Sequence, residues 1–576
     1  MLWSAPFRRA IAFCGGCGYR CDMTDLDATP HPTPAQASPW RQRWAWGVLL
    51  VAWAWYCHHW PHLKTANEAM RLYFVQAVAE TGRPELDAVA ARQGKVPVDR
   101  SEYGGHVYMD KAPGASLLVL PIYPVWRAVD GAVAGPRLWA FGYVATVVAM
   151  ALPLLGALVL LARALRRHGL GAAGIWIAVL GLATASPLLI YATLFFGHAL
   201  AAACVLGAYA IIAAGGSQGL SRRHGWAAGA LLGWAGLTDT PVFVLAAWVA
   251  AYAAVRALPW PGWQVAARLR AVWPVLAGLA VGIAAQLLYN TWVLGHPLRF
   301  TYQFKGDRNL AAIMDTGLLG FRLPQPDALA GLLVGSRRGL IYHAPWLAMA
   351  MAGAAWAARR RDLPQALRLD AASALALGVL YTLFVAGFAD WPAGDSPGAR
   401  HLLPAVPLLA FGIAVAWAPP ATVASPWPWW LRACTAGALA VGVVLHAPTV
   451  ATFPYHFDRV ERPVLELAVP LLLRDGFSPS LGHWAGLDNY ASFAAFCALL
   501  GGAWWLALPR TSGPVNWPVV LSAVAAVLAW LLLLTAAVPE PPGRAAQVGR
   551  YHAWAMLKSG VSGEQPSVRW RIDHGK

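Results

Sequence analysis

A short stretch near the start of the chain combines an acid, a base and a hydroxyl at spacings that suit chemistry. It contains Thr65, Asn67, Glu68 and Arg71, and it opens a helical pattern that we expect to run from about 66 to 80 and to stop at Gly82. A carboxylate such as Glu68 can act as a general base that removes a proton from a hydroxyl group. The spacing Thr65-x-x-Glu68 is also that of a capping box, in which Glu68 only bonds the backbone of the cap residue. The residues alone favour this structural role.

A second stretch reads Tyr108-Met-Asp110-Lys111-Ala-Pro113-Gly114 and places a cation just ahead of an apolar segment. The ammonium of Lys111 could bind a lipid-borne phosphate at headgroup level, or it could simply anchor the chain at the membrane interface. Asp110 suits a salt bridge with a neighbouring cation. Arg137 begins an apolar stretch on the side of the membrane where basic residues are disfavoured, so it is either functional or a packing accident.

Later connections add further candidates. The basic pair Arg337-Arg338 lies in a long polar connection, and the stretch 391–404 combines Asp395 and Arg400 with glycines and prolines. Arg337 and Arg338 break the charge pattern that the other arginines follow, which favours a binding role for them. These cations suit an anionic ligand such as a phosphate.

Two more polar residues have plain structural explanations. His198 follows Phe195-Phe196-Gly197, and a histidine in such a place is more often a hydrogen-bonded packing residue than a ligand or a base. Asp239 precedes Thr-Pro at a helix junction, where N-capping accounts for it. Cys14, Cys17 and Cys21 have the spacing of a zinc knuckle but no certain fourth ligand, so we read them as reduced thiols in a tail.

The composition identifies the environment in which these residues act. Of the 576 residues, 58% are hydrophobic and only 12% are Asp, Glu, Lys or Arg, whereas soluble domains carry roughly a quarter charged residues. Disorder and a disulfide-rich secreted scaffold are excluded by the same numbers. The net charge of +17 does not indicate nucleic acid, because most arginines lie in short connections between apolar stretches, where they set topology. The chain is therefore an all-α, multi-span membrane protein.

Thirteen apolar stretches are long enough to span a bilayer, with ends that the sequence defines to within several residues. We expect spans near 44–58, 137–162, 172–191, 197–214, 225–238, 241–255, 271–291, 340–358, 371–388, 402–419, 433–447, 491–508 and 517–538. A fourteenth stretch, 115–129, is brief, contains two prolines and ends in charged residues.

Charge parity decides the role of segment 115–129. If it does not span, the arginine clusters between the spans share one side with the amino terminus, which is the pattern of a cytoplasmic face. These clusters are Arg8-Arg9, Arg41 and Arg43, Arg163 to Arg167, Arg222-Arg223, Arg256 with Arg268 and Arg270, Arg359 to Arg361, Arg432 and Arg510. We therefore expect an inner-membrane protein with its amino terminus in the cytoplasm, and 115–129 lying in the outer interface or re-entering it.

This topology gives the outer face the long connections, where binding and catalysis usually reside. It divides the chain into a cytoplasmic tail (1–43), a catalytic transmembrane module (44–420), further helices (421–538) and an outer tail (539–576). The module carries outer loops 59–136 and 292–339, and the further helices carry outer loop 448–490.

The order of these motifs resembles the C-type (GT-C) glycosyltransferase superfamily. The resemblance rests on Asn67-Glu68-x-x-Arg71, then Tyr108-x-Asp110-Lys111-Ala-Pro113, then Arg137 at the head of the next span, with weaker matches to about residue 420. It is nearest to bacterial members akin to protein O-mannosyltransferases and the lipid A aminoarabinose transferase. Residues 1–40 and those beyond about 450 have no counterpart.

The resemblance implies a GT-C-type bundle that transfers a sugar, hexosyl or pentosyl, from a polyprenyl-phosphate donor to an acceptor hydroxyl at the outer face, with inversion. It makes Glu68 the catalytic base. It makes Lys111, Arg137, Arg337 and Arg338 the cations that hold the donor phosphate. Weaker substrate contacts are expected from Asn67, Arg71, Tyr108, Asp110, His198, Asp395 and Arg400. The expected partners are the lipid-linked donor, membrane lipids and an acceptor that the sequence does not identify.

The chain departs from the family pattern at two positions. Asn67 stands where an Asp-Glu pair has its first acid, and His198 stands where many relatives have a second outer Asp. No cofactor is implied with certainty, and a divalent metal (Mg²⁺ or Mn²⁺) stays open. Two other functions remain alternatives: a catalytically silent membrane scaffold, which these departures would suit, and a lipid or glycan flippase, which would place charges mid-span.

Overall fold

The computed structural model describes residues 39–133, 137–215, 220–257, 265–420, 426–458, 460–509, 517–535 and 544–559. Most of the predicted cytoplasmic tail, with its three cysteines, and the arginines Arg8, Arg9 and Arg510 lie outside these ranges.

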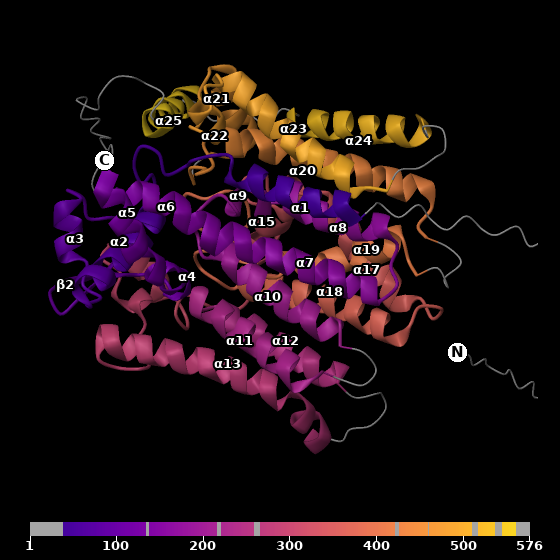
Figure 1. Ribbon diagram of the computed structural model, residues 1–576, viewed down its shortest axis with the longest axis horizontal. Helices are drawn as coiled ribbons and strands as arrows, with labels where there is room; N and C mark the ends of the chain where they lie inside the picture. Colours follow the sequence, from indigo (N-terminus) through magenta and orange to yellow (C-terminus); the bar gives the residue numbers. More distant parts are fainter. Residues whose placement is uncertain are drawn as a thin grey trace, which may run out of the picture.

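A helix occupies each of the thirteen stretches expected to span. They are α1 (Pro39–Ala54), the continuous helix α6 (Leu138–Thr146), η2 (Val147–Ala151) and α7 (Leu152–Arg167), α8 (Ala172–Thr184), α10 (His198–Ala213), α11 (Arg222–Thr238), α12 (Val242–Arg256), α13 (Val265–Leu294), α17 (Trp346–Arg359), α18 (Gln365–Ala386), α19 (Ala410–Trp417), α20 (Trp429–Ala451), α23 (Asn489–Ala507) and α24 (Trp517–Thr535). Most run side by side along the long axis of the molecule (Figure 1).

Five of the described helices are long and apolar enough to cross a membrane: Leu138–Arg167, Val265–Leu294, Gln365–Ala386, Trp429–Ala451 and Asn489–Ala507. Several others, such as α8, α10 and α12, are apolar but shorter. The all-α membrane fold expected from the composition is thus present, whereas the count of thirteen spans stays a prediction.

The connections carry short elements. These are α2 (Ala66–Thr81), α3 (Asp87–Arg92), β1 (Arg100–Tyr103), β2 (His106–Met109), α4 (Gly114–Val119), η1 (Leu120–Ile122), α5 (Tyr123–Val133), α9 (Leu188–Tyr191), η3 (Thr301–Phe304), α14 (Arg308–Met314), α15 (Pro326–Leu333), α16 (Leu340–His343), η4 (Arg400–Leu402), η5 (Val406–Leu409), η6 (Val464–Ala468), α21 (Val469–Leu473), α22 (Leu481–Trp484) and α25 (Arg544–Ser559). Strands β1 and β2 form an antiparallel hairpin in which Ser101 faces Tyr108.

The two ends of the bundle differ in what they hold. Elements α2, α3, β2, α5 and α25 gather at one end, at the left of Figure 1. We call this the loop end. Segment 115–129, which charge parity predicts not to span, contains α4, η1 and the first part of α5, which follow one another without a gap; that it does not span stays a prediction.

Arginine side chains tie helix termini together at the opposite end. Arg166 at the end of α7 donates to Gln42 in α1 at 2.8 Å. Arg167 donates to the carbonyl of Ala214 after α10 at 3.1 Å. Three of the places that charge parity assigned to one side, at the start of α1, at the end of α7 and after α10, therefore lie together, and which side of the membrane they face stays a prediction.

One buried carboxylate organises this basic end. Asp370, near the start of α18, is 0% exposed. Its Oδ1 accepts from the Tyr252 hydroxyl at 2.7 Å and from Arg256 Nε at 2.9 Å. His168 Nε2 lies 2.9 Å from Oδ2, and Tyr209 donates to the backbone carbonyl. Because these partners come from α7, α10 and α12, the cluster fixes four helix ends to one point.

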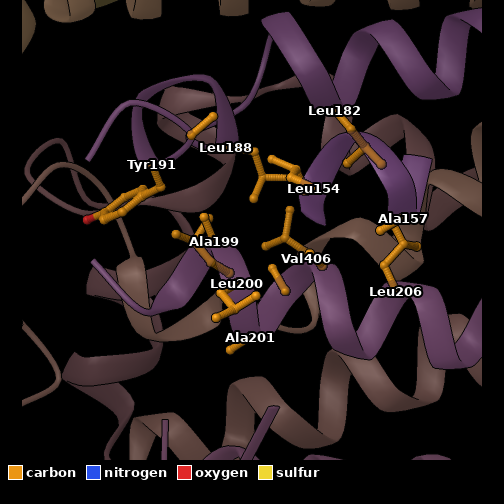
Figure 2. Packing of buried hydrophobic residues seen from close by; sticks show 14 of the residues in the cluster. Leu154, Ala157, Leu182, Leu188, Tyr191, Ala199, Leu200, Ala201, Leu206 and Val406 are labelled. Atoms are coloured by element: carbon orange, nitrogen blue, oxygen red, sulfur yellow. The ribbon is translucent and has the colours of Figure 1, made fainter. Parts of the chain in front are cut away.

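The apolar core runs between the helices. Figure 2 shows its centre, where Leu154 of α7, Leu182 of α8 and Leu206 of α10 meet Val406 of η5; these residues are at most 2% exposed. Helix α10 is buried along almost its whole length. A central apolar helix surrounded by others supplies the rigid frame from which the loops project.

Helices α11 and α13 approach each other closely through glycines. A methyl group added at Gly229 would lie 2.3 Å from the carbonyl oxygen of Val275, and one at Gly282 would lie 2.3 Å from Gly233 Cα. Small residues allow such backbone contact between membrane helices. This contact holds α13 against the bundle although much of α13 is exposed.

Candidate active site

A cavity of about 430 Å³ lies at the loop end of the bundle. Its wall comes from the start of α2, from the connections around α3 and β2, from the connection before α14, from residues 390–400, from residues 453–457 and from α25. The lining residues are Lys64, Thr65, Ala66, Asn67, Lys95, Val98, Asp99, Lys111, Phe196, Lys305, Leu310, Asp390, Ala393, Gly394, Asp395, Arg400, Phe453, Tyr455, Phe457 and Trp554. Every wall is thus supplied by a predicted outer connection or by residues at a helix end.

Lysine is concentrated in this cavity. The whole chain contains six lysines, and the remaining 38 basic residues are arginines. Four of the six, Lys64, Lys95, Lys111 and Lys305, line the cavity together with Arg400. The wall also carries three carboxylates, so cations outnumber acids. This charge balance suits an anionic ligand.

Lys111 and Lys305 are held by shared carboxylates. Lys111 Nζ lies 3.0 Å from Asp99 Oδ2 and 3.2 Å from Asp110 Oδ2, and Lys305 pairs with the same oxygen of Asp110. Ser101 and Lys305 also form an antiparallel bridge. The salt bridge expected for Asp110 is present, and it joins the first outer loop to the middle one.

This network fixes the charges of its members. Burial alone would raise the pKa of Asp99, but the charges of Lys111 and Lys305 lower it to about 2. Burial alone would lower the pKa of Lys111, yet Asp110 and Asp99 raise it above its usual value. Both groups are therefore ionised at neutral pH. Lys111 is a fixed cation at the cavity wall.

Arg400 is a cation of this wall that no carboxylate holds within ion-pair distance among the described residues, although its charge acts on Asp390 and Asp99. Its guanidinium carbon lies 5.8 Å from the ring centre of Phe196. Among the residues that the structure describes, it forms no ion pair with a carboxylate, and its buried Nε has no hydrogen-bond partner. A buried donor without a partner costs free energy, so an anion in the cavity would be stabilised here.

Glu68 lies behind the wall, not on it. Its side chain is 0% exposed. Thr65 caps α2 by accepting from the Glu68 amide at 3.3 Å and donates its hydroxyl to Glu68 Oε2 at 3.1 Å. The Phe195 amide donates to Oε1 at 3.2 Å, and the Tyr455 hydroxyl lies 2.8 Å from Oε2 and donates to the carboxylate. The carboxylate is thus turned toward Tyr455, which does line the cavity.

The surroundings of Glu68 make it a carboxylate that titrates near neutrality. Burial raises its pKa to about 7, and hydrogen bonds from Tyr455, Phe195 and Thr65 together with the charge of Lys64 oppose that rise. The partners of the carboxylate are mostly neutral donors, which stabilise its charge less than a cation would. Such a pKa suits a group that exchanges protons at physiological pH.

Asn67 and Arg71 lie beside Glu68 on α2. Asn67 lines the cavity, and its Oδ1 accepts from Arg71 Nε at 3.1 Å. Arg71 is buried and its Nη1 donates to the carbonyl of Ala112 at 3.1 Å. Arg71 therefore orients Asn67 and holds the residue that follows Lys111.

Two residues expected to touch substrate lie away from the cavity. Arg137 pairs with Asp130 at 3.0 Å and lies 5.2 Å from the ring centre of Trp139, which accounts for its position at the head of α6. Tyr108 is buried in β2 and does not line the wall.

The pair Arg337-Arg338 also does not line the cavity. Arg338 is 1% exposed, and it donates to the carbonyls of Gly394 and Ser396. Arg337 donates to the carbonyl of Asp458 at 2.8 Å, whose carboxylate lies 3.2 Å from Arg338. These arginines hold two loops that form the wall.

His198 and Asp239 pair with each other. His198 Nδ1 lies 3.3 Å from Asp239 Oδ2. Asp239 is the C-cap residue of α11, and its side chain does not cap α12, so the N-capping expectation was wrong.

In the described part of the chain, no three or more His, Cys, Asp or Glu side chains are grouped so as to hold a metal ion. Asp395, in contrast, lies at the cavity wall as expected.

Sequence reasoning missed several residues of the wall, namely Lys64, Lys95, Lys305, Asp390 and Tyr455. Lysine is rare in this chain, and all the lysines of residues 44–538 line this one cavity. Their rarity is the signal from which the first three could have been predicted. Tyr455 lies 387 residues from Glu68 in the sequence, and no local pattern connects them.

No family model matches the chain, and no curated protein matches it. Among solved structures, it aligns with ArnT from Cupriavidus metallidurans bound to undecaprenyl phosphate, with 16% identity, a TM-score of 0.45, and coverage of 85% of this chain and 77% of that one. It also aligns with the oligosaccharyltransferase AglB from Archaeoglobus fulgidus, in complex with an inhibitory peptide and a dolichol-phosphate, with 12% identity, a TM-score of 0.35, and coverage of 90% and 60%.

The apo form of the same ArnT aligns with 17% identity, a TM-score of 0.44, and coverage of 85% of this chain and 76% of that one. At such low scores and identities, the likeness carries no weight for the activity of this chain, which has to be inferred from its own cavity.

Proposed function

We propose that this protein is a membrane glycosyltransferase. It transfers a sugar from a polyprenyl-phosphate donor to an acceptor hydroxyl at the outer face of the cytoplasmic membrane, with inversion at the anomeric carbon. The observation that carries the proposal is the cavity at the loop end, where four of the six lysines of the chain and Arg400 surround a space that a buried carboxylate reaches through Tyr455.

The cations suit the charge that develops during such a transfer. The acceptor oxygen forms a bond to the anomeric carbon while the bond from that carbon to the phosphate oxygen breaks. Its electron pair stays on the phosphate, which thereby gains a negative charge. Fixed cations stabilise such a leaving group best when they are already in place. Lys111 is fixed by two aspartates, and the Arg400 side chain keeps a buried Nε without a hydrogen-bond partner.

The acceptor proton needs a base, and we assign this role to Glu68. Because Glu68 does not line the cavity, the proton reaches it through Tyr455. As the acceptor hydroxyl gives its proton to the Tyr455 oxygen, the Tyr455 hydroxyl gives its own to Glu68, so that the tyrosine ends neutral. The 2.8 Å contact between Tyr455 and Glu68 and the Glu68 pKa of about 7 support this relay.

Transfer from a radiolabelled polyprenyl-phosphate sugar, in membranes with and without the protein, tests the function. We expect labelled acceptor and free polyprenyl phosphate only with the protein. Lys111→Ala should weaken use of the donor strongly, because a buried phosphate loses a charge-assisted partner worth roughly 1.5–3 kcal/mol. A matched control is Arg127→Ala, whose guanidinium pairs with Glu80 away from the cavity.

Three outcomes would contradict the proposal in different ways. A flippase would move the labelled lipid across the membrane without consuming it, and a scaffold would leave it unchanged. If both Lys111→Ala and Arg127→Ala transferred sugar normally, the donor would bind elsewhere. The sugar itself would follow from comparing the envelope glycans of a deletion strain with those of its parent.

A further inference from the structure

The cavity wall carries aromatic side chains as well as cations. Phe196, Phe453, Tyr455, Phe457 and Trp554 all line it. The four residues other than Trp554 are at most 3% exposed, whereas Trp554 is partly exposed. Trp554 is therefore the aromatic ring of this wall that a ligand can reach most readily.

Trp554 is held in place by rings behind it. Its ring centre lies 4.6 Å from that of Phe457 and 6.4 Å from that of Phe453. Tyr551, one turn earlier on α25, stacks on Phe457 at 4.7 Å, and His552 bonds the carbonyl of Glu466. An aromatic ring fixed on its rear side presents a preorganised face to the cavity.

We infer that Trp554 is a sugar-binding platform, on which the ring of a pyranose stacks. One face of many pyranoses exposes a row of C–H bonds, which carry slight positive charge and match the negative face of an aromatic ring. Near the cations, the ring of Phe196 lies against the guanidinium of Arg400 and is only 1% exposed, so it offers a ligand less surface than Trp554 does. The inference rests on the proposed function and assigns the sugar to the side of the cavity that α25 provides, with the phosphate on the side of Lys111 and Arg400.

The stacked ring could belong to the lipid-linked donor or to a glycan acceptor, and binding measurements on the full-length protein distinguish the two. The probes are undecaprenyl phosphate, a panel of undecaprenyl phosphates carrying glucose, mannose or N-acetylglucosamine, and the corresponding free methyl glycosides. We expect Trp554→Ala to weaken binding of a sugar-bearing probe about threefold to tenfold and to leave undecaprenyl phosphate unchanged. A loss confined to the lipid-linked sugars assigns the platform to the donor, and a loss confined to the free glycosides assigns it to the acceptor.

Two further variants separate the contact from mere packing. Tyr551→Ala removes another aromatic ring of α25 that stacks on Phe457 but does not line the cavity, so it should weaken binding of the sugar-bearing probes clearly less than Trp554→Ala. Trp554→Phe keeps an aromatic face and should retain most of the affinity. Equal losses in Trp554→Ala and Tyr551→Ala would show that α25 matters only for stability and would overturn the inference.

The remaining outcomes keep the inference apart from the proposed function. If the wild-type protein bound undecaprenyl phosphate but bound no sugar-bearing probe more tightly and no glycoside, the platform would be refuted while the phosphate site stood. If it bound no lipid phosphate at all, the proposed function itself would fail.

Discussion

Two buried charge clusters lie at opposite ends of the bundle and use the same kinds of residue differently. At the basic end, the Asp370 carboxylate accepts from Tyr252 and Arg256 and lies against His168, and none of these residues lines the cavity. At the loop end, Lys111 is fixed by Asp99 and Asp110 and still faces a cavity.

The two clusters differ in the partners of their charged groups and in their access to a cavity. Around Asp370, the carboxylate is contacted by two side chains of α12 and by His168 at the end of α7, which is the arrangement of a structural joint. Around the cavity, Arg400 lacks a carboxylate partner among the described residues, and Glu68 is paired with neutral donors. A buried charge in a membrane protein is costly and marks function by default, but of these two clusters only the one at the loop end borders a cavity, and that access separates a site from a joint.

The largest effect is expected at the basic end. Asp370→Asn leaves Arg256 and His168 facing a neutral amide, and breaking a buried ion pair from one side costs about 3–5 kcal/mol. Thermal unfolding in detergent should show this loss, and less protein should reach the membrane. Transfer activity per folded molecule should stay normal, because Asp370 is at the end remote from the cavity. If Asp370→Asn were stable but inactive, the cluster around Asp370 would not be a purely structural one, and the contrast between the two clusters would fail.

The second-largest effect is expected for Glu68→Gln. This variant tests whether the Glu68 carboxylate, whose hydrogen-bond donors are neutral, is the catalytic base. Gln can still accept from Tyr455 but cannot take up a proton at neutral pH, so the rate should fall about a hundredfold or more. In the wild type, a base must be ionised, so activity should rise with pH up to about 7, the pKa of Glu68, and then level off. The Gln variant should lose this dependence.

The pH dependence of folding stability that Glu68 causes should run opposite to the pH dependence of activity. The pKa of Glu68 is raised on folding from 4.5 to about 7, so the folded state holds the proton more tightly than the unfolded chain. Stability from this group is therefore greatest below about pH 4.5 and declines as the pH rises toward 7. If Glu68→Gln retained normal turnover, Asp390 or Asp395 at the wall would be the next carboxylates to test.

Arg400→Ala tests a cation of the cavity wall that forms no ion pair with a described carboxylate. Loss of one charge-assisted bond to a phosphate should weaken use of the donor about 10- to 150-fold, from roughly 1.5–3 kcal/mol. The variant should be about as stable as the wild type, since the partly exposed Arg400 forms no ion pair with a described carboxylate. Initial rates over a range of donor concentrations, with unfolding curves beside them, measure both quantities. A destabilised variant with normal rates would make Arg400 another structural joint.

Arg137→Ala should have the smallest effect. Its pair with Asp130 is 42% exposed on the arginine side, and exposed ion pairs contribute about 0–1 kcal/mol. Transfer rates should stay within about twofold of the wild type. A strong loss would return Arg137 to the donor site that the sequence motifs suggest for it.

Local patterns in the sequence predicted what is local in the structure. The helix expected from about 66 to 80 is α2, Ala66–Thr81, with Thr65 as its cap and Gly82 in the left-handed conformation at its end. Composition predicted the helical membrane fold, and arginine parity predicted that the ends of α7 and α10 lie near the start of α1, as they do. Asn67, Lys111, Asp395 and Arg400 were expected at the site and do line the cavity.

Contacts between distant segments could not be predicted in this way. Arg337 and Arg338 stood out because they break the charge pattern, yet Asp458 and two loop carbonyls hold them. That compensation depends on residues about 120 positions away. Likewise, the relay from Glu68 through Tyr455 joins two outer loops that only the folded bundle brings together.

The place of Trp554 in the chain sets an order in time. All other residues of the cavity wall lie between Lys64 and Phe457, whereas Trp554 follows the last predicted span. On the proposed topology, α25 can reach the outer side only after α24 has been inserted. During synthesis the phosphate-binding part is therefore assembled first, and the sugar platform is added only after every predicted span is in the membrane. A nascent chain could hold a lipid phosphate before it could orient a sugar for transfer.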